Sequence, residues 1–197
     1  MYLSTSFLST SFLSTSFLST SFLSTSFLII IFLIMLIMLK KYWSYIFDDQ
    51  IGEWNGVSVY SNKHYENDET VENYYNGVFT GIKWQCVEYA RRYLIITRGI
   101  TFSEVTSAFE IPRAHFTTLN GDNVTITNDL QEGSLIVWPG INSPHGHVAV
   151  VSSILKNGVT VVEQNYNNDN DNSNNNFNHR FIPSREIDSV TIVTCKF

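Results

Sequence analysis

The sequence predicts an α+β domain in which one helix, carrying a cysteine, packs on an antiparallel sheet. From Gln85 to Arg98 there is no Gly or Pro, apolar residues recur at three- and four-residue steps, and Gly99 ends the run. The segments that follow are rich in Val and Ile and are separated by turn signals, as strands are. The predicted strands are 134–138, 147–154, 158–164 and 189–194. A helix followed by such strands favours a layered α+β arrangement.

Cys86 falls in the first turn of this predicted amphipathic helix. A thiol there lies among unpaired backbone N–H groups at the positive end of the helix dipole, which favours the thiolate and lowers the thiol pKa. The alternative is a buried cysteine packed as a small hydrophobe. Cys195 is the only other cysteine. Because a disulfide would consume the candidate nucleophile, we expect two free thiols in a reducing compartment.

The remaining segments are predicted from turn and breaker residues. We expect a short strand within Gly52 to Ser61 and a loop or short helix at 62–77. A short helix capped by Ser103 should run through Ala108 and stop at Pro112. An asparagine-rich stretch at 167–178 has no core-forming content and is expected to be a loop.

The N-terminus has a different composition from the rest of the chain. Residues 1–28 are a low-complexity five-residue repeat, and an apolar run from Phe27 to Leu39 precedes Lys40 and Lys41. As a helix this run would span about 20 Å, short of a bilayer core of roughly 30 Å unless the repeat extends it. We therefore consider a transmembrane segment at 27–41, a cleaved signal peptide, or translation from Met35 or Met38. An anchored domain would be held on the cytoplasmic side by the lysines, and an unanchored one is expected to be cytoplasmic.

The charge of the chain argues against nucleic-acid binding. The formal net charge is −6, and every charged residue lies after residue 39. An acidic surface would suit a cationic substrate. The cluster of Glu66, Asp68, Glu69 and Glu72 either contacts such a substrate or is a solvated face.

His147 is the candidate base for Cys86, because imidazole can accept and return a proton near neutral pH. It opens an apolar strand, whereas His64, His115 and His179 lie in turn-like or polar surroundings. His145 would share a strand face with His147, so geometry alone leaves both open. A metal site on these two histidines lacks a third ligand with suitable spacing, and we expect no metal and no cofactor.

The hairpin around Asn157 and Gly158 decides which residue can orient His147. A two-residue loop at this dipeptide would put Glu163 on the face opposite His147. A three-residue loop at 155–157 would set Asn165 directly opposite His147, with Glu163 diagonally beside it. We therefore expect an odd loop or a bulge, with His147, Glu163 and Asn165 on one face and Cys86 against it.

Three stretches of this chain occur in the order of a known enzyme family. They are Trp84 to Arg92, the Gly-His-Val-Ala-Val run at 146–150, and Glu163-Gln164-Asn165. Together they resemble the CHAP family of cysteine amidohydrolases and peptidases, most closely the amidase domain of glutathionylspermidine synthetase/amidase and of trypanothione synthetase. The resemblance implies a papain-like (NlpC/P60-type) CHAP fold over 51–197, with the nucleophile helix packed on an antiparallel sheet.

The resemblance also implies roles for individual residues. Cys86 would be the nucleophile, His147 the base and Glu163 the third catalytic residue. The regular strand pairing described above slightly favours Asn165 for this third role. Gln85 would assist the Cys86 N–H in binding the oxyanion. Arg91 is a candidate for a substrate carboxylate, although a surface ion pair with Glu88 would explain it equally well.

The expected activity is thiol-dependent hydrolysis of a small-molecule or peptide amide, releasing a polyamine from a glutathione conjugate. The alternatives are a CHAP amidase or endopeptidase that cleaves peptidoglycan, or an inactive membrane-tethered binding module. The chain stops at Phe197, where the resembled domain continues with a further strand, and no ATP-dependent synthetase region follows. We therefore expect no amide synthesis.

Overall fold

The computed structural model describes residues 25–39, 48–65, 70–140, 144–166 and 178–196. Residues 48–197 belong to one compact unit, and residues 25–39 form a helix in the other. Among the described residues, no helix combines the length and apolar character needed to cross a membrane. The transmembrane segment considered at 27–41 stays a prediction, and its last two residues lie outside the described ranges. The repeat before residue 25 and the asparagine-rich residues 167–177 lie outside the described ranges.

The predicted helix is α2, Cys86–Arg98. Gln85 is its extended N-cap residue, and Gly99 ends it with a φ of 63°, a left-handed conformation in which its N–H bonds the carbonyls of Ile95 and Leu94. Both predicted ends are confirmed. The predicted amphipathic pattern is wrong, since every residue from Glu88 to Ile95 is buried. These eight residues cover every side of the helix, and Glu88 and Arg92 form an ion pair inside the protein.

Glu88 shows how this burial is possible. Its carboxylate accepts hydrogen bonds from Arg92 Nε at 2.7 Å and from Asn73 and Thr80 at 2.9 Å each. Gln164 Nε2 donates to the second oxygen at 3.1 Å. The expected ion pair between Glu88 and Arg91 is absent from the described contacts. Glu88 pairs instead with Arg92, which lies one helical turn after it. A buried carboxylate is tolerated when this many donors are bonded to it.

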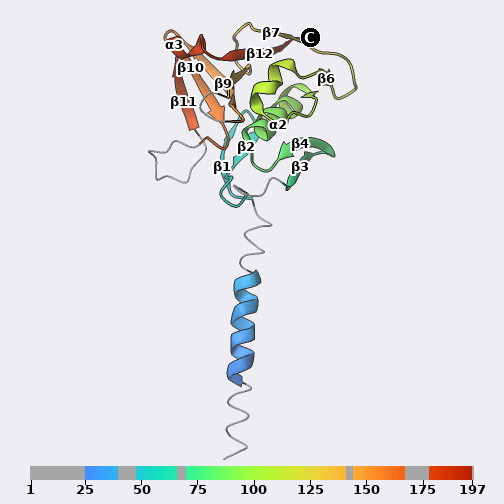
Figure 1. Ribbon diagram of the computed structural model, residues 1–197, viewed down its shortest axis with the longest axis vertical. Helices are drawn as coiled ribbons and strands as arrows, with labels where there is room; N and C mark the ends of the chain where they lie inside the picture. Colours follow the sequence, from blue (N-terminus) through green and yellow to red (C-terminus); the bar gives the residue numbers. More distant parts are fainter. Residues whose placement is uncertain (1–24, 40–47, 66–69, 141–143, 167–177, 197) are drawn as a thin grey trace, which may run out of the picture. The chain divides into compact units, whose positions relative to one another are not determined.

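Six antiparallel strands form the main sheet, in the order β11-β10-β9-β8-β12-β7. Figure 1 shows β11, β10 and β9 side by side. The four strands predicted after the helix are confirmed, whereas β11 and β7 were not expected. The strands in sheet order are β11 (Asn178–Pro183), β10 (Gly158–Glu163), β9 (His147–Leu155), β8 (Leu135–Trp138), β12 (Thr191–Lys196) and β7 (Thr125–Thr127).

Short hairpins and helices complete the unit. The strand expected within 52–61 is part of the pair β1 (Gln50–Trp54) and β2 (Val57–Tyr60), and β3 (Glu72–Tyr75) pairs with β4 (Val78–Ile82) where a loop was expected. The predicted helix from Ser103 is wrong. Instead β5 (Ile100–Phe102) pairs with β6 (Phe116–Thr118), and the 3-10 helix η1 (Ala108–Arg113) begins at a Ser107 capping box and contains Pro112. A further helix, α3, spans Ser184–Ile187.

The sheet separates two apolar clusters. Val148, Val150 and Val162 pack with Tyr89 and other residues of α2 in the larger cluster. Residues of the opposite parity, among them Ala149, Val151 and Val161, pack with Ile182 in the smaller one. Because side chains alternate along a strand, His147 and Glu163 belong to the face that α2 does not cover.

The β9–β10 hairpin contains the expected bulge. Its loop is the two residues Lys156 and Asn157, so the turn lies one residue earlier than Asn157-Gly158. Thr160 pairs with Ser153, but Val161 pairs with Val151, which leaves Ser152 as an extra residue in β9. The shift by one residue puts Glu163 on the same face as His147. The expectation of an odd loop or a bulge is therefore confirmed through the bulge.

The network around Glu88 generates a stability prediction. Replacing Glu88 by Ala should lower the free energy of unfolding by about 3–5 kcal/mol, because Arg92 would remain buried without its partner. Urea denaturation would measure this change. Replacing the exposed Glu132 by Ala should change the free energy by less than about 0.5 kcal/mol. Equal losses in the two variants would contradict the role assigned to Glu88.

Candidate active site

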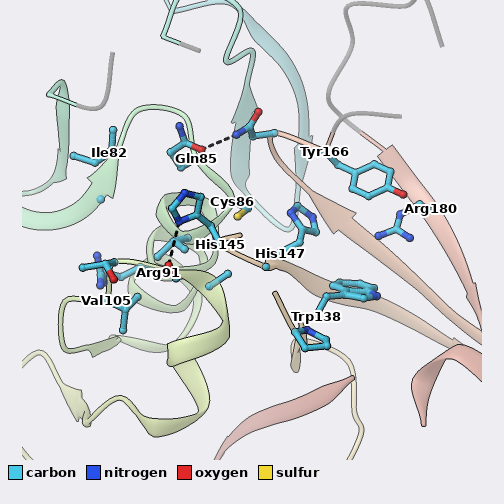
Figure 2. Close-up of a pocket in the computed structure, with 18 of the residues that line it drawn as sticks. Ile82, Gln85, Cys86, Arg91, Val105, Trp138, His145, His147, Tyr166 and Arg180 are labelled. Carbon is cyan, nitrogen blue, oxygen red and sulfur yellow. Dashed lines mark hydrogen bonds between the residues drawn. The ribbon is translucent and has the colours of Figure 1, made fainter. Parts of the chain in front are cut away.

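Cys86 and His147 meet where the start of α2 reaches the end of a strand. Cys86 is the first residue of the helix, and His147 is the first residue of β9. The Cys86 sulfur lies beside the His147 ring (Figure 2), and each group shifts the pKa of the other. We expected Cys86 to lie against the sheet face that carries His147. The helix packs instead on the opposite face, and the two groups come together at the strand end.

The electrostatic balance favours an ionised pair. Burial raises the pKa of the Cys86 thiol, but the charge and hydrogen bond of His147, with the backbone N–H groups of Val148 and Val87, outweigh it and lower the pKa below its ordinary value. Burial lowers the pKa of His147, but Cys86 and Glu163 outweigh this effect and raise it to about 9. A thiolate beside an imidazolium is a nucleophile with a proton donor already in place.

Glu163, rather than Asn165, contacts His147. The His147 Nε2 lies 2.9 Å from a Glu163 carboxylate oxygen, so Nδ1 is left for the thiol. Asn165 does not continue the ladder, because β10 ends at Glu163 and Asn165 adopts a left-handed φ of 54°. Its side-chain amide donates to Gln85 Oε1 at 2.6 Å. The ladder argument for Asn165 is therefore wrong, since it assumed that the strand continues.

Gln85 is oriented by the two residues that follow Glu163. Asn165 holds its side-chain oxygen, and Gln164 Nε2 donates to its backbone carbonyl at 3.2 Å. These contacts use only oxygen atoms of Gln85, and its side chain lines the same cavity as Cys86. The Cys86 N–H, in the first turn of α2, has no partner within the helix. Two donors beside the thiol are suited to an oxyanion.

The site opens into a cavity of about 1140 Å³. On one side of Cys86 the cavity is lined by Arg91 and Val105, and on the other by Trp138, Tyr166 and Arg180 (Figure 2). Sequence reasoning missed the last three. Arg180 follows directly on an asparagine-rich stretch, and only the alternation in 179–182 could have indicated a strand there.

Arg91 is buried beneath this cavity. Its guanidinium donates to the backbone carbonyls of Thr80 at 2.9 Å and Ser103 at 3.1 Å, and it stacks on Phe102. Its Nε has no partner among the described residues. Burial lowers the pKa of Arg91 to about 10, so the group stays charged at neutral pH.

The other histidine of the motif and the second cysteine have different surroundings from those of Cys86 and His147. His145 lines the cavity, but its Nδ1 lies 3.2 Å from the Ser107 hydroxyl. Cys195 is free and buried, and burial raises its pKa to about 11 against the opposing charge of Arg98. No cluster of three or more metal-ligating side chains occurs in the part of the chain described here.

Comparison with known proteins finds a family with a similar sequence. The family model described as the CHAP domain matches residues 73–165, which include Cys86, His147 and Glu163. This part of the chain is similar to a CHAP domain. Its fold is of the α+β class, as the sequence predicted.

The curated relatives are larger proteins. The chain is 33% identical to the bifunctional glutathionylspermidine synthetase/amidase of Escherichia coli (strain K12), over 56% of this chain and 21% of the relative. It is 27% identical to a trypanothione synthetase of Crithidia fasciculata, over 56% of this chain and 18% of the relative. The chain thus spans about a fifth of the length of these relatives.

A search of solved structures found Ly7917 and an N-acetylmuramoyl-L-alanine amidase from Staphylococcus aureus. Ly7917 has a TM-score of 0.42 and 16% identity, over 56% of this chain and 53% of that one. The amidase has a TM-score of 0.38 and 19% identity, over 57% of this chain and 30% of that one.

The ionised pair generates a prediction about thiol reactivity. Cys86 should be alkylated by iodoacetamide well below the ordinary thiol pKa of about 8.5, because a lowered pKa preserves the thiolate as the pH falls. His147→Ala should move the reactivity to higher pH, since burial would then be opposed only by the backbone N–H groups of Val148 and Val87. The pH dependence of the alkylation rate measures both. Cys195→Ala should leave the profile unchanged, and an unchanged profile in His147→Ala would refute the pairing.

Proposed function

We propose that this protein is a thiol-dependent amide hydrolase of the glutathionylspermidine type, which releases a polyamine from a glutathione conjugate. The contact between His147 and Glu163, beside a cysteine at a helix start, carries the catalytic part of the proposal. The likeness to relatives named as glutathionylspermidine synthetase/amidase supports the substrate.

In the proposed reaction the Cys86 thiolate attacks the amide carbonyl, and the oxyanion is bound by the Cys86 N–H and the Gln85 amide. The imidazolium of His147 then donates its proton to the departing amine, which leaves an acyl-enzyme. Neutral His147 next takes a proton from water, the resulting hydroxide attacks the thioester, and the acid and thiol are released. Glu163 stabilises the imidazolium throughout.

Arg91 is proposed to attract a carboxylate on the acyl side of the substrate. Its charge is solvated by backbone carbonyls, and it forms no ion pair with a carboxylate of the described residues. Carbonyl oxygens accept hydrogen bonds from its two terminal nitrogens without cancelling its charge. A positive potential therefore remains at one side of the cavity, where an anionic substrate group would be favoured.

The substrate prediction is tested with the full chain. We expect hydrolysis of glutathionylspermidine and no release of soluble fragments from purified cell wall. Cys86→Ala should abolish hydrolysis and keep the circular dichroism spectrum, because covalent catalysis has no substitute for the thiolate. Cys195→Ala should retain activity. Cleavage of cell wall alone would show that the substrate is peptidoglycan and not the polyamine conjugate. Equal losses of activity in both cysteine variants would refute the assignment of Cys86 as the nucleophile.

The third catalytic residue is tested by comparing two substitutions. Glu163→Gln should lower kcat by about 10²–10⁴-fold, because the imidazolium loses its carboxylate partner. Asn165→Ala should lower it by about tenfold or less, the worth of one hydrogen bond to Gln85. Steady-state kinetics on folded variants would measure both. A larger loss at Asn165 would transfer the orienting role from the carboxylate to the amide.

A further inference from the structure

Four side chains form a row across four neighbouring strands on the sheet face opposite α2. Trp138 on β8 pairs with His147 on β9. Beyond the bulge, β10 brings Glu163 to the same face, and on β11 Arg180 pairs with Val161, two residues from Glu163. Cation, carboxylate and imidazole thus lie side by side in sheet order, with Trp138 at the end of the row.

Arg180 makes the most extensive contact with Glu163. Its Nε lies 2.7 Å from one carboxylate oxygen and its NH2 group 2.9 Å from the other. The second of these oxygens is also the one that contacts His147. The Glu163 side chain is 0% exposed, so these two residues supply its ionic environment. A fork of two N–H groups fixes the plane of a carboxylate, which a single contact with His147 cannot do.

Two aromatic rings enclose both cations. The Arg180 guanidinium carbon lies 4.0 Å from the Tyr166 ring centre and 4.9 Å from that of Trp138. The His147 ring lies 5.3 Å and 5.7 Å from the same two rings. Figure 2 shows Arg180 between Tyr166 and Trp138. The rings restrict the guanidinium to one position and hold it against the carboxylate.

The charges around Glu163 show what Arg180 contributes. Burial raises the pKa of the Glu163 carboxyl, and the hydrogen bonds and charges of Arg180 and His147 outweigh it and lower the pKa. His147 alone could not maintain this state, because it loses its proton when the leaving amine is protonated. Arg180 is a permanent cation, and Glu186 and Tyr166 are the other titratable groups that act on it. The carboxylate therefore stays ionised while His147 is neutral.

We propose that Arg180 is a positioning residue, which holds the Glu163 carboxylate in the orientation that His147 requires throughout the reaction. The catalytic unit is then Cys86, His147 and Glu163 supported by a guanidinium between two aromatic rings. This inference rests on the proposed function for its kinetic part only. The state of the thiol can be measured without any substrate.

Arg180→Met is the central test. It keeps much of the side-chain length and removes the charge. We expect kcat to fall by about 10–10³-fold, within the range that general acid–base catalysis supplies, with little change in KM. In the pH profile of the Cys86 alkylation rate, the acid limb should move to higher pH by about one unit, because loss of a nearby cation disfavours every neighbouring anion. Arg180→Lys should leave the limb closer to wild type, since it keeps the charge and loses only the fork.

A double-mutant cycle shows whether Arg180 acts through Glu163. Adding Arg180→Met to Glu163→Gln should lower kcat by less than about twofold, because no carboxylate remains to be held. The exposed Arg185 gives a matched control, and Arg185→Met should change neither kcat nor the alkylation profile. Multiplying losses in the double variant would overturn the proposal. So would a change confined to KM, or an alkylation profile unaffected by Arg180→Met.

The two proposals can fail separately. A wild-type protein that hydrolyses neither substrate would refute the proposed function, while the alkylation profiles would still decide the role of Arg180. An active protein whose Arg180→Met variant keeps both kcat and the profile would refute the positioning role alone.

Discussion

In the β9–β10 hairpin one extra residue, Ser152, lies in β9 opposite Thr160. The Thr160 hydroxyl lies 2.8 Å from the Ser152 hydroxyl and 2.6 Å from that of Ser153, so both residues of the bulge are tied to the partner strand. Without the extra residue the alternation along β10 would turn Glu163 to the other face of the sheet. The contact with His147, and the row of side chains that ends at Arg180, both depend on this shift.

The end of β10 serves both faces of the sheet. Glu163 and Gln164 are successive residues, so their side chains leave the strand on opposite sides. Glu163 binds His147 on one side. On the other, Gln164 contacts the Glu88 carboxylate and the Gln85 carbonyl, and thereby holds the start of α2. A few adjacent residues thus place both the nucleophile helix and the imidazole relative to one strand.

The buried carboxylates of Glu88 and Glu163 are both bound by an arginine and by further donors. Glu88 is held by Arg92 with neutral donors, and Glu163 by Arg180 with His147. Each carboxylate is 0% exposed and each has an arginine at 2.7 Å, so neither would be tolerated without its partner. The difference lies in the second cation. At Glu163 it is the His147 imidazole, which can give up its proton, whereas the described contacts of Glu88 include no second cation.

The sequence alone determined the local features of this domain. Helix propensity, a terminating glycine and alternating Val and Ile located α2 and four strands, and motif order indicated Cys86 and His147. The sequence also predicted an irregular β9–β10 hairpin, because a regular two-residue hairpin at Asn157-Gly158 would place Glu163 and His147 on opposite faces of the sheet. Only the tertiary structure decided between Glu163 and Asn165, since the choice depends on where β10 ends. Only the fold shows that Arg180 contacts Glu163. The two residues are distant in sequence, and no local pattern predicts which strand will lie beside β10.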